Sequence, residues 1–217
     1  MKKLESSFKN MVIVLTVVAV VAGLLLGYVN KLTAEPIAQA NAKALSDAIA
    51  LVVPGFDNEP AANPDTIEVA GVTYKIYKAT KGDKFIGAAV ESSANGFGGA
   101  LTVLVGFDAD GKIIDYSLLS HAETPGLGSK AADWFKKGGK GDITGKNPGD
   151  KPLTVSKDGG EIDAITASTI TSRAFLNAVN AAYAAYAKQN GNEAAGLNGT
   201  TGATSHVEQN QERRGYE

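Results

Sequence analysis

The chain has 217 residues, of which 44% are hydrophobic and 20% are charged, and its formal net charge is -2. This length allows one folded domain with appended segments, and the balanced charge gives no reason to expect a nucleic-acid partner. The absence of cysteine excludes disulfides, thiolate metal sites and thiol nucleophiles. Two histidines are too few for a multi-histidine metal site, so no metal site is predicted.

The first predicted element is a transmembrane helix over residues 11–30. The stretch MVIVLTVVAVVAGLLLGY, from Met11 to Tyr28, is almost entirely apolar, and no charged residue lies between Asn10 and Asn30. As a helix, this uncharged stretch is about 31 Å long, which matches the hydrocarbon core of a bilayer. A cleaved signal peptide is the alternative, but its apolar region is usually only about 7–15 residues long. We therefore predict an uncleaved anchor in the lipid bilayer.

The basic residues on either side of this helix predict its orientation. Three lysines precede it within the first ten residues, whereas Lys31 and Lys43 follow it at wider spacing. The positive-inside rule then places residues 1–10 in the cytoplasm. In a bacterium the protein would be a single-pass protein of the inner (cell) membrane, with its body on the periplasmic or outer side.

Residues 31–56 are predicted to form a stalk helix that leaves the membrane. Pro36 suits a first helical turn, and Pro54 followed by Gly55 ends the helix. The stalk is expected to pack on the body of the protein or on a partner subunit, and a turn-rich linker over residues 57–65 follows it. The packing stripe is apolar at helical spacing except for one asparagine, and it consists of Ile37, Asn41, Ala44, Leu45, Ala48, Ile49 and Val52.

The middle of the chain is predicted to form an antiparallel sheet. The turn sequence DADG at residues 108–111 joins two strongly β-prone segments, and the glycine-rich sequence NGFGG at residues 95–99 lies between two others. The predicted strands are residues 72–79, 85–90, 101–107 and 112–119. After them we expect a short helix at 131–137, a polar loop at 138–150, and short strands at 153–155 and 162–165.

A final helix is predicted over residues 169–188, and its apolar face consists of Phe175, Val179, Ala182, Tyr183 and Tyr186. Residues 191–217 lose all periodicity and are predicted to be a disordered tail. The fold class is therefore α+β: a single transmembrane helix, then a domain over residues 57–190 in which helices flank an antiparallel sheet.

One segment with possible chemistry is HAETPGLGSK, residues 121–130, which directly follows a predicted strand. Pro125 fixes one backbone dihedral angle, while Gly126 and Gly128 permit positive φ, so the backbone can turn tightly and approach a flat ligand. Glu123 and Thr124 add an acceptor and a hydroxyl group at this turn. An ordinary proline–glycine loop is the alternative, and the composition alone favours it.

The second such segment is DAITASTITS, residues 163–172, with five hydroxyl side chains where the final helix begins. A helix N-terminus presents unpaired amide groups and the positive end of the helix dipole, which together suit a phosphate group. A threonine or serine hydroxyl there can cap the helix, bind the phosphate or be esterified to it. Taken alone, the stretch favours the alternative that involves no ligand, in which Asp163 or Thr166 is expected to cap the helix.

Three segments together carry a family resemblance. NGFGG…LTVLVGFDADGKI, SHAETPGLGSK and DAITASTITS occur in this order and spacing in proteins with a covalent-FMN domain. The chain resembles the G subunits of Rnf electron-transport complexes and is similar to the C subunits of sodium-translocating NADH:quinone reductases. The resemblance covers residues 1–188, and the length without large insertions favours the Rnf family.

The resemblance implies that FMN is covalently attached. In this family the last threonine of a [ST]GAT motif carries FMN through a phosphoester, and a separate flavin transferase attaches it from FAD. Thr166 to Thr169 occupy the motif here, so Thr169 is the implied attachment residue. Two residues depart from the pattern: Ala167 replaces the usual glycine and Ser168 the usual alanine. An alanine in the left-handed conformation costs roughly 1 kcal/mol or more.

The resemblance also implies the other residues of the flavin site. A literal TGAT at residues 201–204 is a competing match, but it lacks an aspartate three residues ahead and an apolar helix behind it, so Thr169 is favoured over Thr204. Besides Thr169, the implied cofactor-binding residues are Asp163, Thr166, Ala167, Ser168, Ile170, Glu123, Thr124, Gly126, Leu127 and Gly128.

The implied function is electron transfer by a membrane-anchored subunit of an ion-translocating ferredoxin:NAD oxidoreductase. The flavin performs the redox chemistry, so no independent catalysis by this chain is expected. Its implied partners are the other subunits of the complex in the membrane and, during maturation, the flavin transferase. The alternatives are a flavinylated regulatory or sensory membrane protein, the C subunit of a sodium-translocating NADH:quinone reductase, and a structural module that is never flavinylated.

Overall fold

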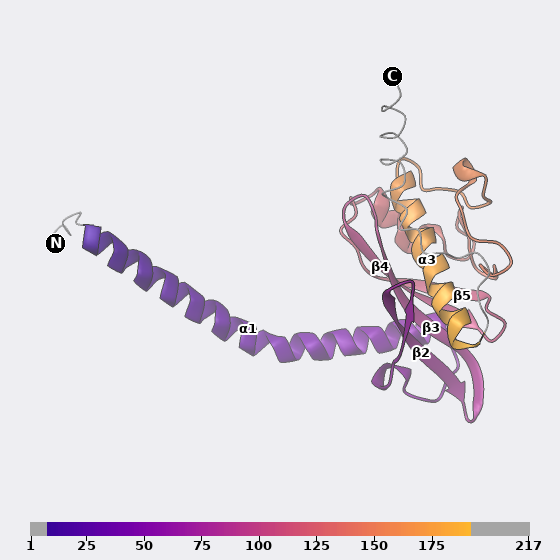
Figure 1. Cartoon of the computed structure of the whole chain (residues 1–217), viewed down its shortest axis with the longest axis horizontal. Coiled ribbons are helices and arrows are strands. Elements are labelled where there is room, and N and C mark those ends of the chain that lie inside the picture. Colours follow the sequence, from indigo (N-terminus) through magenta and orange to yellow (C-terminus); the bar gives the residue numbers. More distant parts are fainter. Residues whose placement is uncertain (1–7, 192–217) are drawn as a thin grey trace, which may run out of the picture. The chain divides into compact units, whose positions relative to one another are not determined.

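The computed structural model describes residues 8–191 (Figure 1). The contacts divide the chain into a helical unit that ends at Ala44 and a compact body that begins at Leu45. In the body, helices pack on both faces of one antiparallel sheet, which confirms the predicted α+β class. The first seven residues and the predicted tail beyond residue 191 lie outside the described part of the chain.

Helix α1 runs from Phe8 to Val52 and joins the two predicted N-terminal helices into one. Among the described residues it is the one helix that is long and apolar enough to cross a membrane, and its most apolar stretch is not buried. Pro36 lies inside this helix and not in a first turn, so that expectation was wrong. Proline removes a single main-chain hydrogen bond, and the turns on either side continue the helix. The division into residues 11–30 and 31–56 stays a prediction.

The five-stranded sheet is an antiparallel meander with the strand order β1-β2-β3-β4-β5. Asp108 closes the predicted turn between β4 and β5, because its Oδ1 atom accepts hydrogen bonds from the backbone N–H groups of Asp110 and Lys112, both at 2.9 Å. The strands are β1 (Asp65–Val69), β2 (Val72–Lys81), β3 (Lys84–Asn95), β4 (Ala100–Asp108) and β5 (Ile113–Ser120).

The edge strand β1 is the strand that the sequence analysis did not predict. It pairs only with β2, and its side chains are at most half-buried, so the apolar signal of a core strand is weak there. The turn that joins it to β2 consists of Ala70 and Gly71, both with positive φ (52° and 80°). Such a two-residue turn matches the twist of a hairpin.

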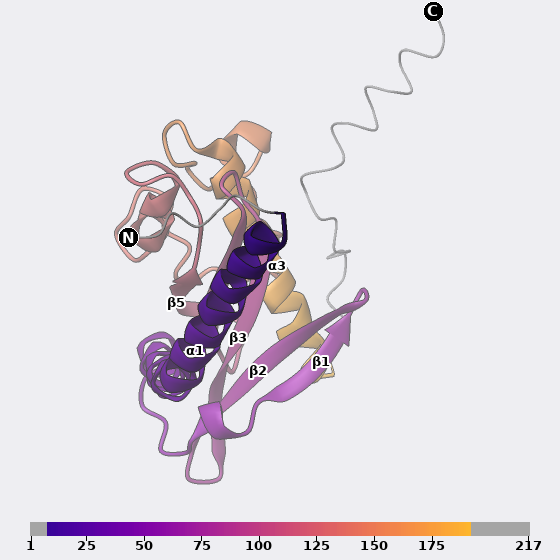
Figure 2. The same ribbon diagram turned by 90° about the vertical axis from the view of Figure 1, so that its left-hand side faces the viewer.

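Helix α3 (Thr169–Gln189) covers one face of the sheet, as Figure 1 and Figure 2 show. Its observed bounds agree with the predicted helix at residues 169–188 to within one residue. Phe175 is the centre of the packing: its ring stacks on Phe135 with centroids 4.4 Å apart and meets Tyr116 edge-on at 4.7 Å. The other buried members of this core come from α3 itself, from strands β2 to β5 and from the segments between β5 and α3.

The C-terminal turns of α1 cover the opposite face. Ala48, Ile49 and Val52 are buried there against side chains of β2, β3 and β4. The helix end comes so close to β4 that a Cβ atom at Gly106 would collide with the carbonyl group of Val52. The part of the predicted stalk stripe beyond Leu45 therefore packs on the body of the protein itself.

The connections between β5 and α3 contain less regular structure than predicted. Helix α2 (Ala131–Trp134) is shorter than the expected 131–137 helix, and the two expected strands reduce to one parallel bridge between Val155 and Ile162. In the first of the two expected strands, the Asn180 side chain of α3 binds both the N–H and the C=O of Leu153, each at 2.9 Å. Those groups are therefore not available to a strand partner. Three 3-10 turns complete the fold: η1 (Pro60–Ala62), η2 (Gly128–Lys130) and η3 (Ser156–Asp158).

Candidate functional site

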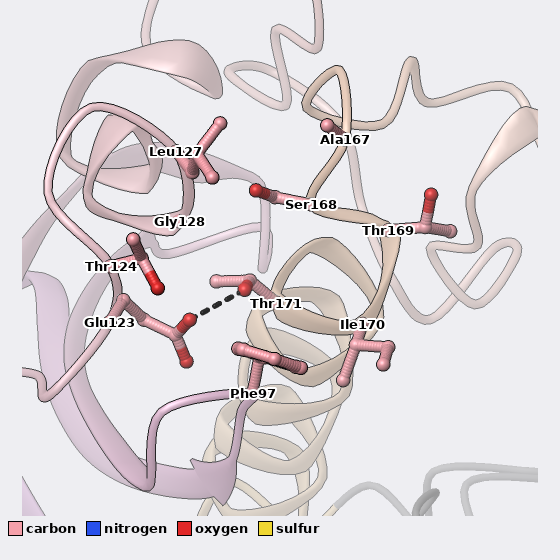
Figure 3. Close-up of a pocket in the computed structure, with 10 residues that line it drawn as sticks. All are labelled: Phe97, Glu123, Thr124, Leu127, Gly128, Ala167, Ser168, Thr169, Ile170 and Thr171. Atoms are coloured by element: carbon pink, nitrogen blue, oxygen red, sulfur yellow. Dashed lines mark hydrogen bonds between the residues drawn. The ribbon is translucent and has the colours of Figure 1, made fainter.

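Three loop segments meet at one end of α3 and enclose a cavity of about 410 Å³ (Figure 3). The segments are the loop between β3 and β4, the turn after β5, and the start of α3. This volume lies in the range of small-molecule and cofactor sites. The cavity is lined by Phe97, Glu123, Thr124, Leu127, Gly128, Ala167, Ser168, Thr169, Ile170 and Thr171.

The turn after β5 is held closed by its own backbone. The carbonyl oxygen of Thr124 accepts from the N–H groups of Leu127 at 3.2 Å and Ser129 at 3.3 Å. The N–H of Gly126 donates to Ser129 Oγ at 2.9 Å, and Gly126 has φ of 75°, which glycine adopts without a penalty. The turn therefore presents the side chains of Thr124 and Leu127 at the cavity without relying on a ligand.

Glu123 is a buried carboxylate at the back of the cavity, with 5% of its surface exposed. Its Oε2 atom accepts a 2.7 Å hydrogen bond from the Thr171 hydroxyl, the dashed line in Figure 3. Its Oε1 atom accepts from the N–H of Gly98 in the β3–β4 loop at 3.3 Å. One side chain thus connects all three segments that form the cavity, and hydrogen bonds to a charged group are the stronger kind.

Glycines make this arrangement of Glu123 possible. A Cβ atom at Gly96 would collide with its carboxylate, and one at Gly98 would collide with the carbonyl group of Ala122. The β3–β4 loop, residues 96–99, is closed by a 2.8 Å hydrogen bond from the Gly96 N–H to the Gly99 carbonyl. The glycines of NGFGG therefore permit a close approach between two loops.

The start of α3 is organised by a buried serine. Ser172 Oγ accepts from the N–H of Ile165 at 2.9 Å and donates to the carbonyl of Ser168 at 2.9 Å. Ser168 occupies the N-cap position but makes no side-chain capping bond, and the first turn contains no acidic residue. Its amide groups and the positive end of the helix dipole are thus left to interact with an anion.

Asp163 and Thr166 do not cap this helix, so that expectation was wrong. The carbonyl group of Asp163 accepts a 2.8 Å bond from the Trp134 indole, and its Oδ1 accepts from Ser156 Oγ at 3.4 Å. These contacts tie Asp163 to α2 and η3, too early in the chain to reach the first-turn amides. Thr166 is exposed in the turn before the helix.

Ala167 has φ of 61°, in the left-handed region that favours glycine. Glycine is the residue expected at this position from the family resemblance, and alanine is penalised there. The structure shows the reason: the chain reverses at Ala167, so that Ser168 takes the N-cap position and α3 begins at Thr169. An alanine in this conformation costs roughly 1–2 kcal/mol.

The hydroxyl groups of Ser168 and Thr169 differ in direction. In Figure 3 the Ser168 hydroxyl points toward Leu127, whereas the Thr169 hydroxyl points away from Leu127 and Glu123. Thr169 is half-buried at the rim of the cavity, and its Oγ1 accepts a 3.3 Å hydrogen bond from Lys157. Both hydroxyls are therefore candidates for contact with a ligand.

Large apolar side chains surround the cavity. Phe97 is 71% exposed, Ile170 51% and Leu127 41%, although each lines the cavity. Exposed apolar side chains that converge on one hollow suit a flat apolar ligand, while the uncapped helix start suits an attached anionic group. The residues present therefore fit a flavin mononucleotide, which combines a flat ring system with a phosphate.

Most of the residues expected from the sequence meet at this cavity. Asp163, Thr166 and Gly126 do not line it, whereas Phe97 and Thr171 do and were not predicted. Thr171 could have been found by extending the apolar stripe of the final helix backward from Phe175 by one turn. Phe97 carries no such signal, because a lone aromatic residue in a glycine-rich loop has no periodicity.

The features outside the cavity add no further candidate site among the described residues. Among residues 8–191, no group of three or more histidine, aspartate or glutamate side chains is placed to hold a metal ion. Trp134 is half-buried against the core and bonds to Asp163. The competing TGAT motif that ends at Thr204 lies outside the described residues.

Comparison with known proteins gives consistent matches. The FMN-binding domain family matches residues 96–184, a range that contains every residue lining the cavity. The chain is 34% identical to the G subunit of the ion-translocating oxidoreductase complex of Cereibacter sphaeroides, over 75% of this chain and 76% of that protein. It is 35% identical to the protein of the same name from Yersinia pestis, over 70% of this chain and 77% of that protein. It is 33% identical to the G subunit of the proton-translocating ferredoxin:NAD(+) oxidoreductase complex of Clostridium ljungdahlii, over 77% of this chain and 85% of that protein.

Proposed function

The chain belongs to the family of G subunits of ion-translocating oxidoreductase complexes, and on this basis we propose that it carries FMN as a phosphoester of Thr169. As a subunit of a redox-driven translocase it works together with the other subunits of its complex. The observation that carries the proposal is the position of Thr169, which lines the rim of an apolar-lined cavity and begins the uncapped first turn of α3.

Attachment is a phosphoryl transfer to the Thr169 hydroxyl, performed by a flavin transferase. The Thr169 Oγ1 atom attacks the phosphorus of the FMN half of FAD, and a new O–P bond forms as the bridging P–O bond of the pyrophosphate breaks. AMP leaves, and the hydroxyl proton is lost to a base of the transferase. The linked phosphoryl group keeps one negative charge, which the start of α3 stabilises.

When bound, the flavin supplies the electron-transfer chemistry. The chain positions it: the apolar side chains of Phe97, Leu127 and Ile170 would contact the ring system, and Thr124 offers a hydroxyl group to a ring heteroatom. Glu123 and Thr171 would act indirectly, because they bind each other and hold the loops in place. Covalent attachment prevents loss of the flavin on a side of the membrane where none is supplied.

The proposal extends to topology and domains. Residues 11–30 would cross the bilayer, residues 1–10 would face the cytoplasm, and residues 31–56 would connect the membrane to the FMN-binding domain at 57–190. The domain would lie on the periplasmic or outer side of the cell membrane. Electrons would pass between ferredoxin and NAD through the flavin and the cofactors of partner subunits, and the partners would couple this transfer to ion transport.

The mass and fluorescence of the denatured protein test the attachment. Co-production with the flavin transferase should add about 438 Da, the mass of FMN less water, and should make the denatured protein band fluorescent. Thr169→Ala should abolish both signals. Matched variants that remove neighbouring hydroxyls, Ser168→Ala, Thr166→Ala and Thr204→Ala, should keep them. Fluorescence that persists in Thr169→Ala and disappears in any of the other three would show that the attachment site is wrong.

A further inference from the structure

The loop over residues 153–162 lies against the same side of α3 as Thr169. Asn180 binds the backbone of Leu153 at one end of the loop, through two hydrogen bonds of 2.9 Å. Arg173 holds the loop at Asp158: its Nε and Nη2 atoms each donate a 2.7 Å hydrogen bond to the carboxylate of Asp158. Thr169, Arg173 and Asn180 are spaced by four and seven residues, so they share one face of the helix.

This anchoring brings one cation to the Thr169 hydroxyl. Lys157 precedes Asp158 in the 3-10 turn η3, and its ammonium group donates a 3.3 Å hydrogen bond to Thr169 Oγ1. The loop is closed on itself as well, because the Ser156 N–H donates to the Ile162 carbonyl at 2.8 Å. The position of Lys157 thus follows from a loop that is fixed at several points, although the side chain itself is exposed.

Lys157 also differs from its neighbours in charge pairing. Arg173 pairs with Asp158, and Lys151, two residues before the loop begins, pairs with Glu161 at 2.8 Å. Within residues 8–191 no carboxylate oxygen lies within 4.0 Å of the Lys157 ammonium. Its one hydrogen bond in that part of the chain is to the hydroxyl that we propose is esterified. Its positive charge is therefore directed at this position.

We propose that Lys157 is a phosphate-binding residue, which holds the phosphoryl group at Thr169 during attachment and afterwards. This inference rests on the proposed esterification of Thr169. The ammonium matches the single negative charge that the linked group keeps, and it approaches from the loop, on the side away from Glu123. By accepting a bond from Lys157, the Thr169 oxygen uses a lone pair and leaves its own proton free for removal.

The test measures attachment with purified components: the unflavinylated full chain, the flavin transferase and FAD. At low ionic strength, Lys157→Gln should lower the initial rate of attachment about tenfold, the effect of losing one hydrogen bond to a charged group. Lys157→Arg should restore most of the rate. Lys151→Gln removes the same charge six residues earlier, just before the loop, and should leave the rate unchanged. Added salt should reduce the difference in attachment rate between wild type and Lys157→Gln, because salt screens the charge of the ammonium group.

A second measurement reports on the finished linkage. The difference in thermal midpoint between the flavinylated and unflavinylated forms should be smaller in Lys157→Gln than in wild type, while the unflavinylated forms unfold alike because the side chain is exposed. The inference is overturned if Lys157→Gln matches wild type in either measurement, or if Lys151→Gln is slowed equally. Those outcomes leave Thr169 in place, whereas a fluorescent Thr169→Ala would remove the proposed esterification itself.

Discussion

Four of the five hydroxyl side chains at the start of α3 form two groups with opposite environments, and the fifth, on Ser168, points toward Leu127 at the cavity (Figure 3). The outer group, Thr166 and Thr169, is exposed or half-buried. The inner group, Thr171 and Ser172, is buried, and each member has a hydrogen-bond partner inside the protein. The inner hydroxyls join the helix to the loops around it and therefore have a structural role. The outer hydroxyls are left available for a ligand.

The helical spacing of the sequence places the two groups on different faces of α3. Residues 171 and 172 lie one turn before the buried residues Phe175 and Leu176, so they point toward the core. Thr169 lies on the adjoining face, with Arg173 one turn later. A hydroxyl on the inner face must be bonded, because an unsatisfied buried polar group is costly. Substitutions in the two groups should therefore have different consequences.

The largest effect on stability is expected at the partner of the inner group, Glu123. Glu123→Ala leaves the Thr171 hydroxyl and the Gly98 N–H without their acceptor and creates a cavity, so the free energy of unfolding should fall by about 3 kcal/mol. Chemical denaturation of the unflavinylated protein measures it. Glu161→Ala, at an exposed carboxylate, is the control and should change it far less. Similar losses in the two variants would contradict a structural role for Glu123.

Ser172→Ala is expected to have the next largest effect. It leaves the buried N–H of Ile165 without its partner, which should lower the free energy of unfolding by about 2 kcal/mol. Thr166→Ala, the matched change in the outer group, should cost no more than about 0.5 kcal/mol. Folded Ser172→Ala protein should still accept flavin at Thr169. If both changes cost the same, the division into inner and outer hydroxyls is wrong.

A smaller effect, an increase in stability, is expected from Ala167→Gly. Glycine adopts the positive φ at this position without the alanine penalty, so the protein should gain about 1 kcal/mol of stability. The control is Ala70→Gly, at φ of 52° in the β1–β2 turn, which should give a similar gain. Only Ala167→Gly should also change the rate of flavin attachment, because only Ala167 lines the cavity. A loss of stability in Ala167→Gly would contradict the strained conformation.

The smallest effect is expected from Asp158→Asn, beside the outer group. The pKa of Arg173 is raised by its hydrogen bond to Asp158, but the two side chains are 41% and 38% exposed, so solvent and salt weaken the pair. The loss of stability should stay below about 1 kcal/mol and shrink at high salt. Denaturation at two salt concentrations measures it. A larger, salt-independent loss would show that the 153–162 loop is held more strongly than this pair allows.

The fold was largely predictable where the sequence has a clear period. Four of the strands and α3 followed from alternation and helical spacing. Their observed bounds agree with the predicted ones to within two residues, except that β3 continues to Asn95, five residues beyond its predicted end. The edge strand β1 and the bridge at Val155 have short, weak patterns, and a side chain of α3 took the hydrogen bonds that a longer strand would have needed. Local patterns cannot show that a distant side chain competes for the backbone.

Within the site, the sequence determined which residue types were present, and the tertiary structure decided what each one does. The motif at Thr166 to Thr169, the turn at Glu123 to Gly128 and the unusual alanine at 167 were all visible in the chain. The pairing of Glu123 with Thr171, residues 48 positions apart, was not. Neither was the approach of Lys157 to Thr169, because contacts between loops depend on how α3 packs on the sheet and not on the periodicity of any one segment.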